Sequence, residues 1–317
     1  MVTATAARFD TGTAVSFECE GCRLYGALHR PADPAQGKTA VILLNQGPVD
    51  RAGSHRLYIK LAHQLTALGY SVLRFDARGV GESEGLWEGE PQSLSVLDVY
   101  ARIQRGAWAD DTRAAIDYLR TSHGIDRVIL GGLCGGACTA VFAGASHPAV
   151  DGMFVIGAPI TFASATRRVA DLPQAIVERE AKGYLRKLMR LSSWKRVLTL
   201  QTDYKMAARV VAVRMQRVLR PNQAAENDSN VNMPMLKAIQ DAAKRRKRIL
   251  FVFGENDVLW QEFQEHLPRF GARLPFELKT IPEGNHVLTE EPWQQALFTH
   301  VSDWLVPARE GAQRRLA

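Results

Sequence analysis

One of the four cysteines lies where the chain could present a nucleophile. An apolar run at residues 127–130 is followed by Gly-Gly-Leu-Cys-Gly-Gly and a helical pattern at 136–145, so Cys134 occupies the centre of Gly-x-Cys-x-Gly. A strand that enters a helix through such glycines holds its central residue on a sharp turn, where the helix N-terminus favours a thiolate. Cys134 is the candidate nucleophile, and the amide of Gly135 is a candidate donor to a developing oxyanion.

Two candidate partners for Cys134 follow later apolar runs. Asp257 comes just after the run at 248–253, and His286 comes just after the run at 276–281. Nucleophile, acid and base occur in the order expected for this kind of turn. His286 would take the thiol proton and later give a proton to the leaving group, while Asp257 would fix the imidazole tautomer and offset its charge.

Each of these two residues also has a simpler interpretation. Asp257 could cap the helix that begins near Val258, and His286 could be an ordinary loop histidine. Glu255 is the nearest competing carboxylate. The three alternatives remain open at the level of sequence.

A second oxyanion donor should come from the loop after the apolar run at 39–44, which reads Asn-Gln-Gly-Pro at 45–48. Pro48 has no N–H, so the donor must be an earlier amide. We expect the amide of Gly47, with that of Gln46 second.

Apolar runs and amphipathic patterns alternate on both sides of these residues. The expected strands lie at 14–17, 24–29, 39–44, 71–75, 127–130, 153–156, 248–253 and 276–281, and the expected helices at 57–68, 108–119, 136–145 and 292–304. The alternation predicts an α/β fold with a mostly parallel sheet and helices on both faces.

A long helical stretch interrupts the alternation at 160–246. We interpret this stretch as a helical lid inserted into a core of residues 1–159 and 247–317, because open α/β sheets bind ligands at the edge where such an insertion would lie. The insertion carries 18 Lys and Arg against 7 Asp and Glu, while the rest of the chain carries 22 against 26. The net charge of +7 therefore belongs to this segment.

The basic insertion could bind an acidic carrier protein, a coenzyme A phosphate or an anionic lipid surface, or it could simply be a solvated helical surface. It lacks the interleaved aromatic residues and the motifs of nucleic-acid binding, so we expect no nucleic-acid partner. The sequence predicts no oligomeric state.

Composition places the protein among ordinary globular chains, with 317 residues of which 46% are hydrophobic. No apolar stretch reaches the ~18 residues of a membrane span, and no apolar signal core follows Met1, so we expect a cytoplasmic protein, with peripheral membrane contact as the alternative. A zinc site is the alternative for Cys19, Cys22, Cys134 and Cys138, but Cys19 and Cys22 flank a predicted hairpin turn. We expect no metal or organic cofactor.

Five segments together resemble the α/β-hydrolase superfamily, over residues 14 to 305. They are Asn-Gln-Gly-Pro at 45–48, Asp-x-Arg-Gly-x-Gly-x-Ser at 76–83, the turn at 132–136, Gly-x-x-Asp at 254–257 and Gly-Asn-His at 284–286. Outside the insertion the chain is similar to the serine-aminopeptidase-like hydrolases. The resemblance implies an α/β-hydrolase fold with an oxyanion loop whose third residue donates, which favours Gly47.

The departure from that pattern is Cys134, where most members carry Ser; dienelactone hydrolases and polyhydroxyalkanoate synthases share a cysteine there. An acyl-cysteine is a thioester, and a thiolate leaves readily from a tetrahedral adduct, so cysteine favours activated ester or thioester substrates over peptides. We expect a hydrolase or acyltransferase that acts on a small-molecule or carrier-bound acyl substrate through an acyl-cysteine. The alternative is a catalytically inactive binding protein of the same fold.

Overall fold

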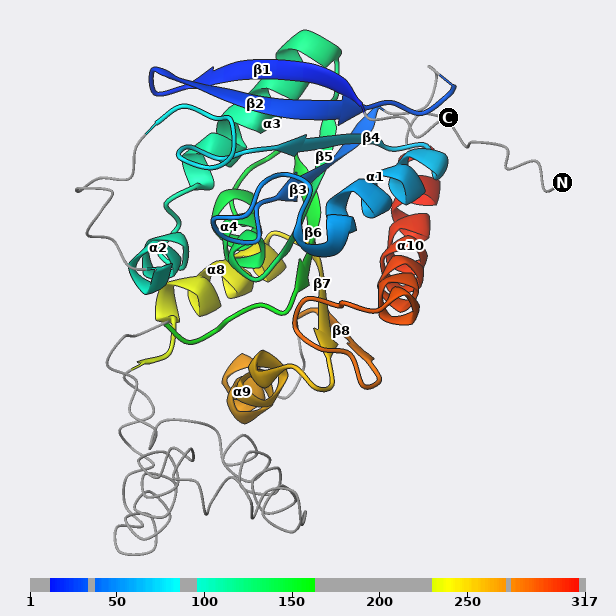
Figure 1. Ribbon diagram of the computed structural model, residues 1–317. Helices are drawn as coiled ribbons and strands as arrows, with labels where there is room; N and C mark the ends of the chain where they lie inside the picture. Colours follow the sequence, from blue (N-terminus) through cyan, green and yellow to red (C-terminus); the bar gives the residue numbers. More distant parts are fainter. Residues whose placement is uncertain (1–11, 34–37, 86–95, 163–229, 272–274, 314–317) are drawn as a thin grey trace, which may run out of the picture. The chain divides into compact units, whose positions relative to one another are not determined.

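The computed structural model describes residues 12–33, 38–85, 96–162, 230–271 and 275–313 (Figure 1). The chain divides into two units, with residues 161–231 forming the second. Of that second unit only 161–162 and 230–231 are described, where Thr161 and Val231 form an isolated antiparallel β-bridge. All the helices and strands below belong to the first unit.

The described residues form one sheet of eight strands in the order β1-β2-β4-β3-β5-β6-β7-β8. The strands are β1 (Thr13–Cys19), β2 (Cys22–His29), β3 (Thr39–Leu44), β4 (Ser71–Phe75), β5 (Arg127–Leu133), β6 (Val150–Ile156), β7 (Arg248–Gly254) and β8 (Glu277–Ile281). β2 pairs antiparallel with β1 and β4, and all other neighbours are parallel. The predicted α/β fold with a mostly parallel sheet is confirmed.

Helices cover both faces of this sheet (Figure 1). They are α1 (Leu57–Ala67), α2 (Val96–Ile103), α3 (Ala109–His123), α4 (Gly135–Gly144), α8 (Met233–Lys244), α9 (Val258–His266) and α10 (Glu291–Gln313), with short 3-10 turns at Ser54–Arg56 and Leu267–Phe270. α1 and α10 contact each other on one face, and α4 contacts α3 and α8 on the other. No helix in the described part of the chain has the length and hydrophobicity to span a bilayer.

The apolar runs form strands because both of their faces are covered. All five residues of β4 are buried, as are the last five of β3, which is the pattern expected of parallel strands between two helical layers. Leu57, Leu61 and Leu65 share one face of α1 and join the core cluster that includes Trp304 of α10.

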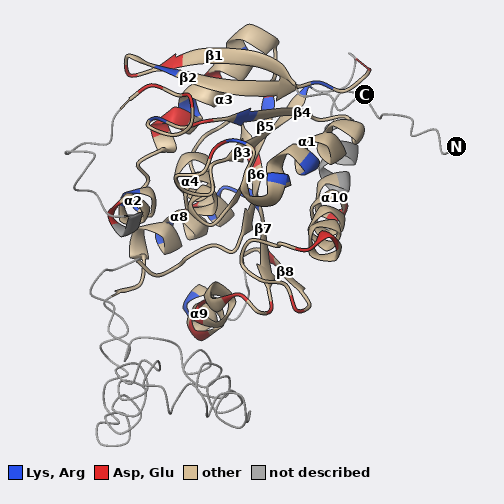
Figure 2. Cartoon of the chain, in the orientation of Figure 1, with Lys and Arg blue, Asp and Glu red and all other residues tan. Residues whose placement is uncertain are grey.

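One helix of the core lies within the segment assigned above to the insertion. α8 belongs to the first unit, contacts α4 and β7, and buries Met235, Leu236 and Ile239. The rest of that segment, 163–229, lies outside the described residues, so the helical lid stays a prediction. Figure 2 shows charges of both signs scattered over the helices and loops of the described core.

The four cysteines are free thiols in two separate places. Cys19 and Cys22 face each other across the β1–β2 turn, while Cys134 and Cys138 lie at the start of α4. Within the described ranges, no group of three or more His, Cys, Asp or Glu side chains gathers as a metal site requires.

Candidate active site

The turn between β5 and α4 holds Cys134 in a left-handed conformation, with φ 55° and ψ −112°. A non-glycine residue pays roughly 1–3 kcal/mol for such a backbone and keeps it only when its surroundings enforce it. Here the crowding is severe: a Cβ atom at Gly132 would lie 2.4 Å from the Gly136 carbonyl carbon, and one at Gly136 would lie 2.3 Å from the Leu44 carbonyl oxygen. Only glycines allow the turn to close this tightly, which leaves Cys134 half-buried at its tip.

A buried tyrosine supports this turn from behind. The Tyr58 hydroxyl donates to the Leu44 carbonyl oxygen (2.7 Å) and accepts from the Leu133 N–H (2.8 Å). It therefore ties the last residue of β3 to the last residue of β5, one position before Cys134. Burial raises the pKa of Tyr58, so the hydroxyl stays protonated and can make both bonds.

The structure brings Cys134, His286 and Asp257 together at the carboxyl ends of β5, β8 and β7. His286 Nδ1 lies 2.7 Å from Asp257 Oδ2, and Cys134 lies near enough to act on the ring electrostatically. Burial lowers the pKa of His286, but the hydrogen bond to Asp257 and the negative charges of Asp257 and Cys134 outweigh it and raise the pKa to about 10. The imidazole is thus held ready to carry a proton beside the thiol.

Asp257 is a helix cap and the partner of His286 at once. Its Oδ1 accepts from the Leu259 N–H (2.9 Å) at the start of α9, while Oδ2 faces His286. The competing carboxylate is engaged elsewhere, because Glu255 is exposed and accepts from the Thr280 hydroxyl (3.1 Å). The cap at the start of α9 therefore fixes the orientation of the carboxylate that holds the histidine.

Gly157, directly after β6, lets this pair approach the sheet. Its φ is +50°, and a Cβ atom there would lie 3.0 Å from both Asp257 Oδ2 and His286 Nδ1. Sequence analysis did not single out Gly157. The signal available for it was a glycine immediately after a predicted strand.

The predicted oxyanion donors are arranged differently from what we expected. The Gly135 N–H donates to the Gln46 carbonyl oxygen at 2.9 Å, so an oxyanion can take this N–H only after that bond opens. In a trans peptide the C=O and N–H point in opposite directions, so the Gly47 N–H faces away from Gly135 in this arrangement. Rotation of the 46–47 peptide plane would withdraw the carbonyl and turn the Gly47 N–H toward the site.

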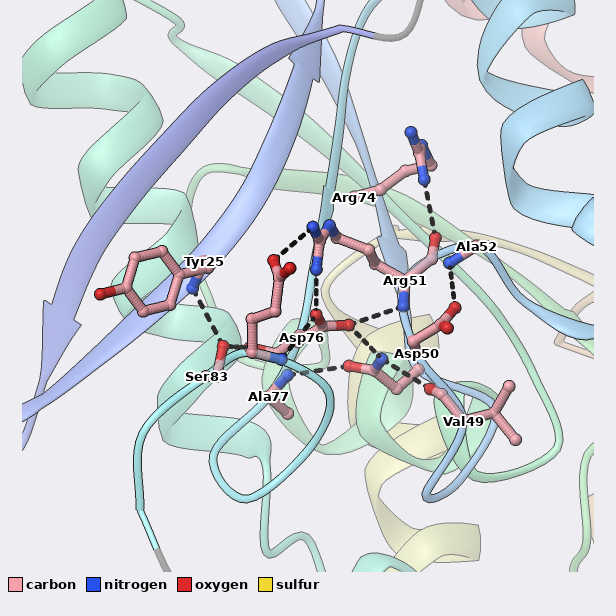
Figure 3. Close-up of polar contacts among 11 residues, drawn as sticks. Tyr25, Val49, Asp50, Arg51, Ala52, Arg74, Asp76, Ala77 and Ser83 are labelled. Carbon is pink, nitrogen blue, oxygen red and sulfur yellow. Dashed lines mark hydrogen bonds and ion pairs between the residues drawn. The ribbon is translucent and has the colours of Figure 1, made fainter.

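A buried carboxylate anchors the loop that contains Gln46 and Gly47 (Figure 3). Asp76, fully buried after β4, accepts from the Arg51 N–H (2.6 Å) and from Asn45 Nδ2 (3.4 Å), and it pairs with the Arg51 guanidinium. Both ends of the 45–51 loop are therefore bonded to one side chain.

The rest of the 76–83 motif completes this anchor (Figure 3). The Ser83 hydroxyl donates to the Asp76 carbonyl oxygen (2.5 Å) and accepts from the Tyr25 N–H (2.9 Å), while Asn45 Oδ1 accepts from the Ala77 N–H (2.9 Å). These hydrogen bonds join β2, β3 and β4 beneath the loop. The side chains of Asp76 and Ser83 are engaged in these structural contacts.

Fold and site define an α/β hydrolase. The model of one family of these enzymes, described as serine aminopeptidase, S33, matches residues 37–293. This is most of the chain, and the protein belongs to that family.

Solved structures of similar fold include several hydrolases. An esterase from Pyrococcus furiosus is 18% identical with a TM-score of 0.57, covering 93% of this chain and 90% of its own. A dienelactone hydrolase from Anabaena variabilis is 16% identical with a TM-score of 0.55, covering 93% and 96%. A Butyrivibrio proteoclasticus protein bound to ferulic acid is 16% identical with a TM-score of 0.55, covering 93% and 98%. No curated protein matches the sequence. At these identities the likeness establishes the fold.

Asp257→Asn should separate the two roles of this side chain. Asparagine caps helices as well as aspartate, so α9 should keep its N-terminus, while loss of the charge should bring the pKa of His286 down from about 10 toward 6.5. NMR titration of the His286 Cε1–H, assigned with His286→Gln, measures the shift. Because the folded state raises this pKa, its stabilising effect is full below pH 6.5 and disappears as pH rises toward 10, so wild type should lose stability relative to the variant over that range. An unchanged pKa in Asp257→Asn would contradict the assignment.

Asp76→Asn should destabilise the protein by roughly 1.5–3 kcal/mol, because a buried hydrogen-bonded charge loses its pairing with Arg51. Urea unfolding measures the change. The matched control is Asp110→Asn, whose carboxylate is 56% exposed and pairs with Arg113 on the surface of α3; it should cost less than about 1 kcal/mol. Equal losses in the two variants would show that Asp76 is not the anchor.

Proposed function

We propose that the protein is a hydrolase or acyltransferase that acts on an ester or thioester through an acyl-cysteine at Cys134. One observation carries the proposal: Cys134 occupies a strained, positive-φ turn at the end of β5, its negative charge acts on His286, and His286 is in turn held by Asp257. A nucleophile, a base and an orienting carboxylate in series form the arrangement required for covalent acyl transfer.

In the first half-reaction the proton of the Cys134–His286 pair already lies on the imidazole, because the pKa of His286 is raised to about 10, and the Cys134 sulfur forms a bond to the acyl carbon. The resulting tetrahedral adduct carries its negative charge on the former carbonyl oxygen. When the adduct collapses, the bond to the leaving alcohol or thiol breaks, and His286 gives that group its proton. The product is a thioester on Cys134 and a neutral histidine.

In the second half-reaction His286 takes a proton from water or from an acceptor alcohol, thiol or amine. The deprotonated acceptor forms a bond to the acyl carbon, and the bond to Cys134 breaks. His286 keeps the proton beside the released sulfur, which restores the starting state. Water gives hydrolysis, and any other acceptor gives transfer.

The oxyanion would be stabilised by the backbone N–H groups of Gly47 and Gly135. This assignment requires the Gln46 carbonyl to leave the Gly135 N–H, through the peptide rotation described above. One such donor contributes roughly 2.7–4 kcal/mol of transition-state stabilisation.

Substrates with good leaving groups fit a cysteine nucleophile best. A thiolate is expelled from a tetrahedral adduct more readily than an amine, so amide cleavage needs prior protonation of the leaving nitrogen. Ester and thioester substrates avoid that requirement. The names of the structural relatives, an esterase, a dienelactone hydrolase and a protein that binds ferulic acid, are consistent with ester chemistry.

A catalytically inactive binding protein is the second candidate, and one observation favours it. The Gln46 carbonyl accepts from the very N–H that an oxyanion would need. If that arrangement were permanent, the protein would bind a ligand beside Cys134 without turning it over.

Intact-mass measurement after incubation with a panel of acyl thioesters and p-nitrophenyl esters decides between the two candidates. Wild type should gain the mass of one acyl group, and Cys134→Ala should gain none because the sulfur is gone. Cys22→Ala, which removes a thiol from the β1–β2 turn, is the matched control and should still be acylated. Absence of any wild-type adduct, together with saturable ligand binding, would favour the binding protein.

The carrier-bound form of the substrate is a further part of the proposal, based on the basic composition of the segment 160–246. A phosphopantetheine carrier, coenzyme A or an anionic lipid headgroup would supply the complementary phosphate charge. Higher ionic strength should lower kcat/KM for a coenzyme A thioester more than for the uncharged N-acetylcysteamine thioester of the same acyl group. Arg186→Glu with Arg190→Glu should reduce that difference. Equal salt dependence of kcat/KM for the two substrates would contradict the proposed anionic carrier or headgroup.

A further inference from the structure

The helix α2 covers both glycines of the expected oxyanion site. A Cβ atom at Gly47 would lie 2.4 Å from the Tyr100 hydroxyl oxygen, and one at Gly135 would lie 3.1 Å from Ile103 Cγ2. Tyr100 and Ile103 are three residues apart and lie on the same side of α2. The helix therefore presents one polar and one apolar group to the two glycines, with the phenol oxygen beside Gly47.

The Tyr100 hydroxyl is available to donate a hydrogen bond. Tyr100 is half-buried, and no hydrogen bond engages its hydroxyl within the described ranges. Burial raises the pKa of Tyr100 to about 12, and the negative charge of Cys134 adds to the shift. The phenol is therefore neutral at physiological pH, and its O–H group could donate a hydrogen bond to a developing oxyanion.

The other tyrosine near the nucleophile is already engaged. The Tyr58 hydroxyl uses its proton on the Leu44 carbonyl oxygen and its lone pair on the Leu133 N–H. It can hold the turn, but it has no proton to offer a substrate. Tyr100 differs from Tyr58 in that its hydroxyl has no such partners among the described residues, and in lying beside Gly47.

We infer that the Tyr100 hydroxyl is a catalytic hydrogen-bond donor to the oxyanion, acting beside the Gly47 N–H. The inference rests on the proposed acyl transfer at Cys134. In the tetrahedral adduct, the phenolic O–H would donate to the oxygen that gains negative charge when the Cys134–acyl carbon bond forms. No proton is transferred from the phenol, so the O–H bond remains intact through both half-reactions.

This donor fits the resting arrangement of the loop. The Gly135 N–H is engaged by Gln46, and the Gly47 N–H faces away until the 46–47 peptide rotates. The Tyr100 hydroxyl needs only rotation about its C–O bond to point at a bound carbonyl. It can thus bind the substrate carbonyl before both backbone donors are in place, and it completes a three-donor site afterwards.

Tyr100→Phe tests the inference because it keeps the ring and removes only the hydroxyl. The rate of Cys134 acylation by a p-nitrophenyl ester should fall by about 10²-fold, the lower range for loss of one oxyanion donor. The rate of Cys134 alkylation by iodoacetamide should not change, because that displacement forms no oxyanion. The alkylation rate also reports whether the turn and the Cys134–His286 pair are intact.

Tyr118→Phe is the matched control. The Tyr118 hydroxyl bonds to His123 Nε2 (2.9 Å) and its ring stacks on Phe17, away from the turn, so its loss should change neither rate. An unchanged acylation rate in Tyr100→Phe would overturn the inference, and so would an equal loss of acylation and alkylation. Absence of acylation in wild type would instead overturn the proposed function, together with the inference that depends on it.

Discussion

The site depends on a single constraint, the need for β5 to become α4 within one residue. That residue is Cys134, and its left-handed backbone is tolerated only because its neighbours leave no room for another path. The strain, roughly 1–3 kcal/mol, is comparable to the net contribution of two or three hydrogen bonds. The Tyr58 hydroxyl supplies two of these at the ends of β3 and β5. The position of the Cys134 sulfur is thus fixed by hydrogen bonds of a residue that itself makes no contact with a substrate.

Parallel topology does the rest of the positioning. Because β3, β5, β6, β7 and β8 all end at one edge, loops that are more than 100 residues apart in sequence meet there. Asp257 shows how closely local and long-range structure are coupled, since one oxygen starts α9 and the other holds His286. Asp76 couples local and long-range structure in a similar way, because it follows β4 and accepts hydrogen bonds from Arg51 and Asn45 of the loop that carries Gln46.

The features that could be predicted from the sequence are those that depend on the pattern of residues close together in the chain. The glycines around Cys134 indicated the turn, and the strands before Asp257 and His286 placed both residues at the correct edge of a parallel sheet. Helical periodicity does not say which surface a helix packs on, so α8 was assigned to the insertion although it packs on α4. The contacts of Tyr58 and Tyr100 depend on long-range packing. A tyrosine within a helical pattern does not indicate which distant residue it will contact. The direction of the Gln46 carbonyl is a choice between two orientations of one peptide plane, which residue type does not determine.

The Gln46 carbonyl opposes the proposed catalysis, and the strength of its hydrogen bond can be compared with the stabilisation of the transition state. A neutral backbone hydrogen bond has a net worth of about 1 kcal/mol, whereas a donor to an oxyanion stabilises the transition state by roughly 2.7–4 kcal/mol. In the proposed reaction a charged oxygen would therefore outcompete the carbonyl for the Gly135 N–H. Before the adduct forms, the carbonyl satisfies a buried amide that would otherwise lack a partner, at a cost of ~1–3 kcal/mol. The hydrogen bond between the Gly135 N–H and the Gln46 carbonyl thus stabilises the free protein, and in the proposed reaction it would be weak enough to yield when negative charge develops on the substrate.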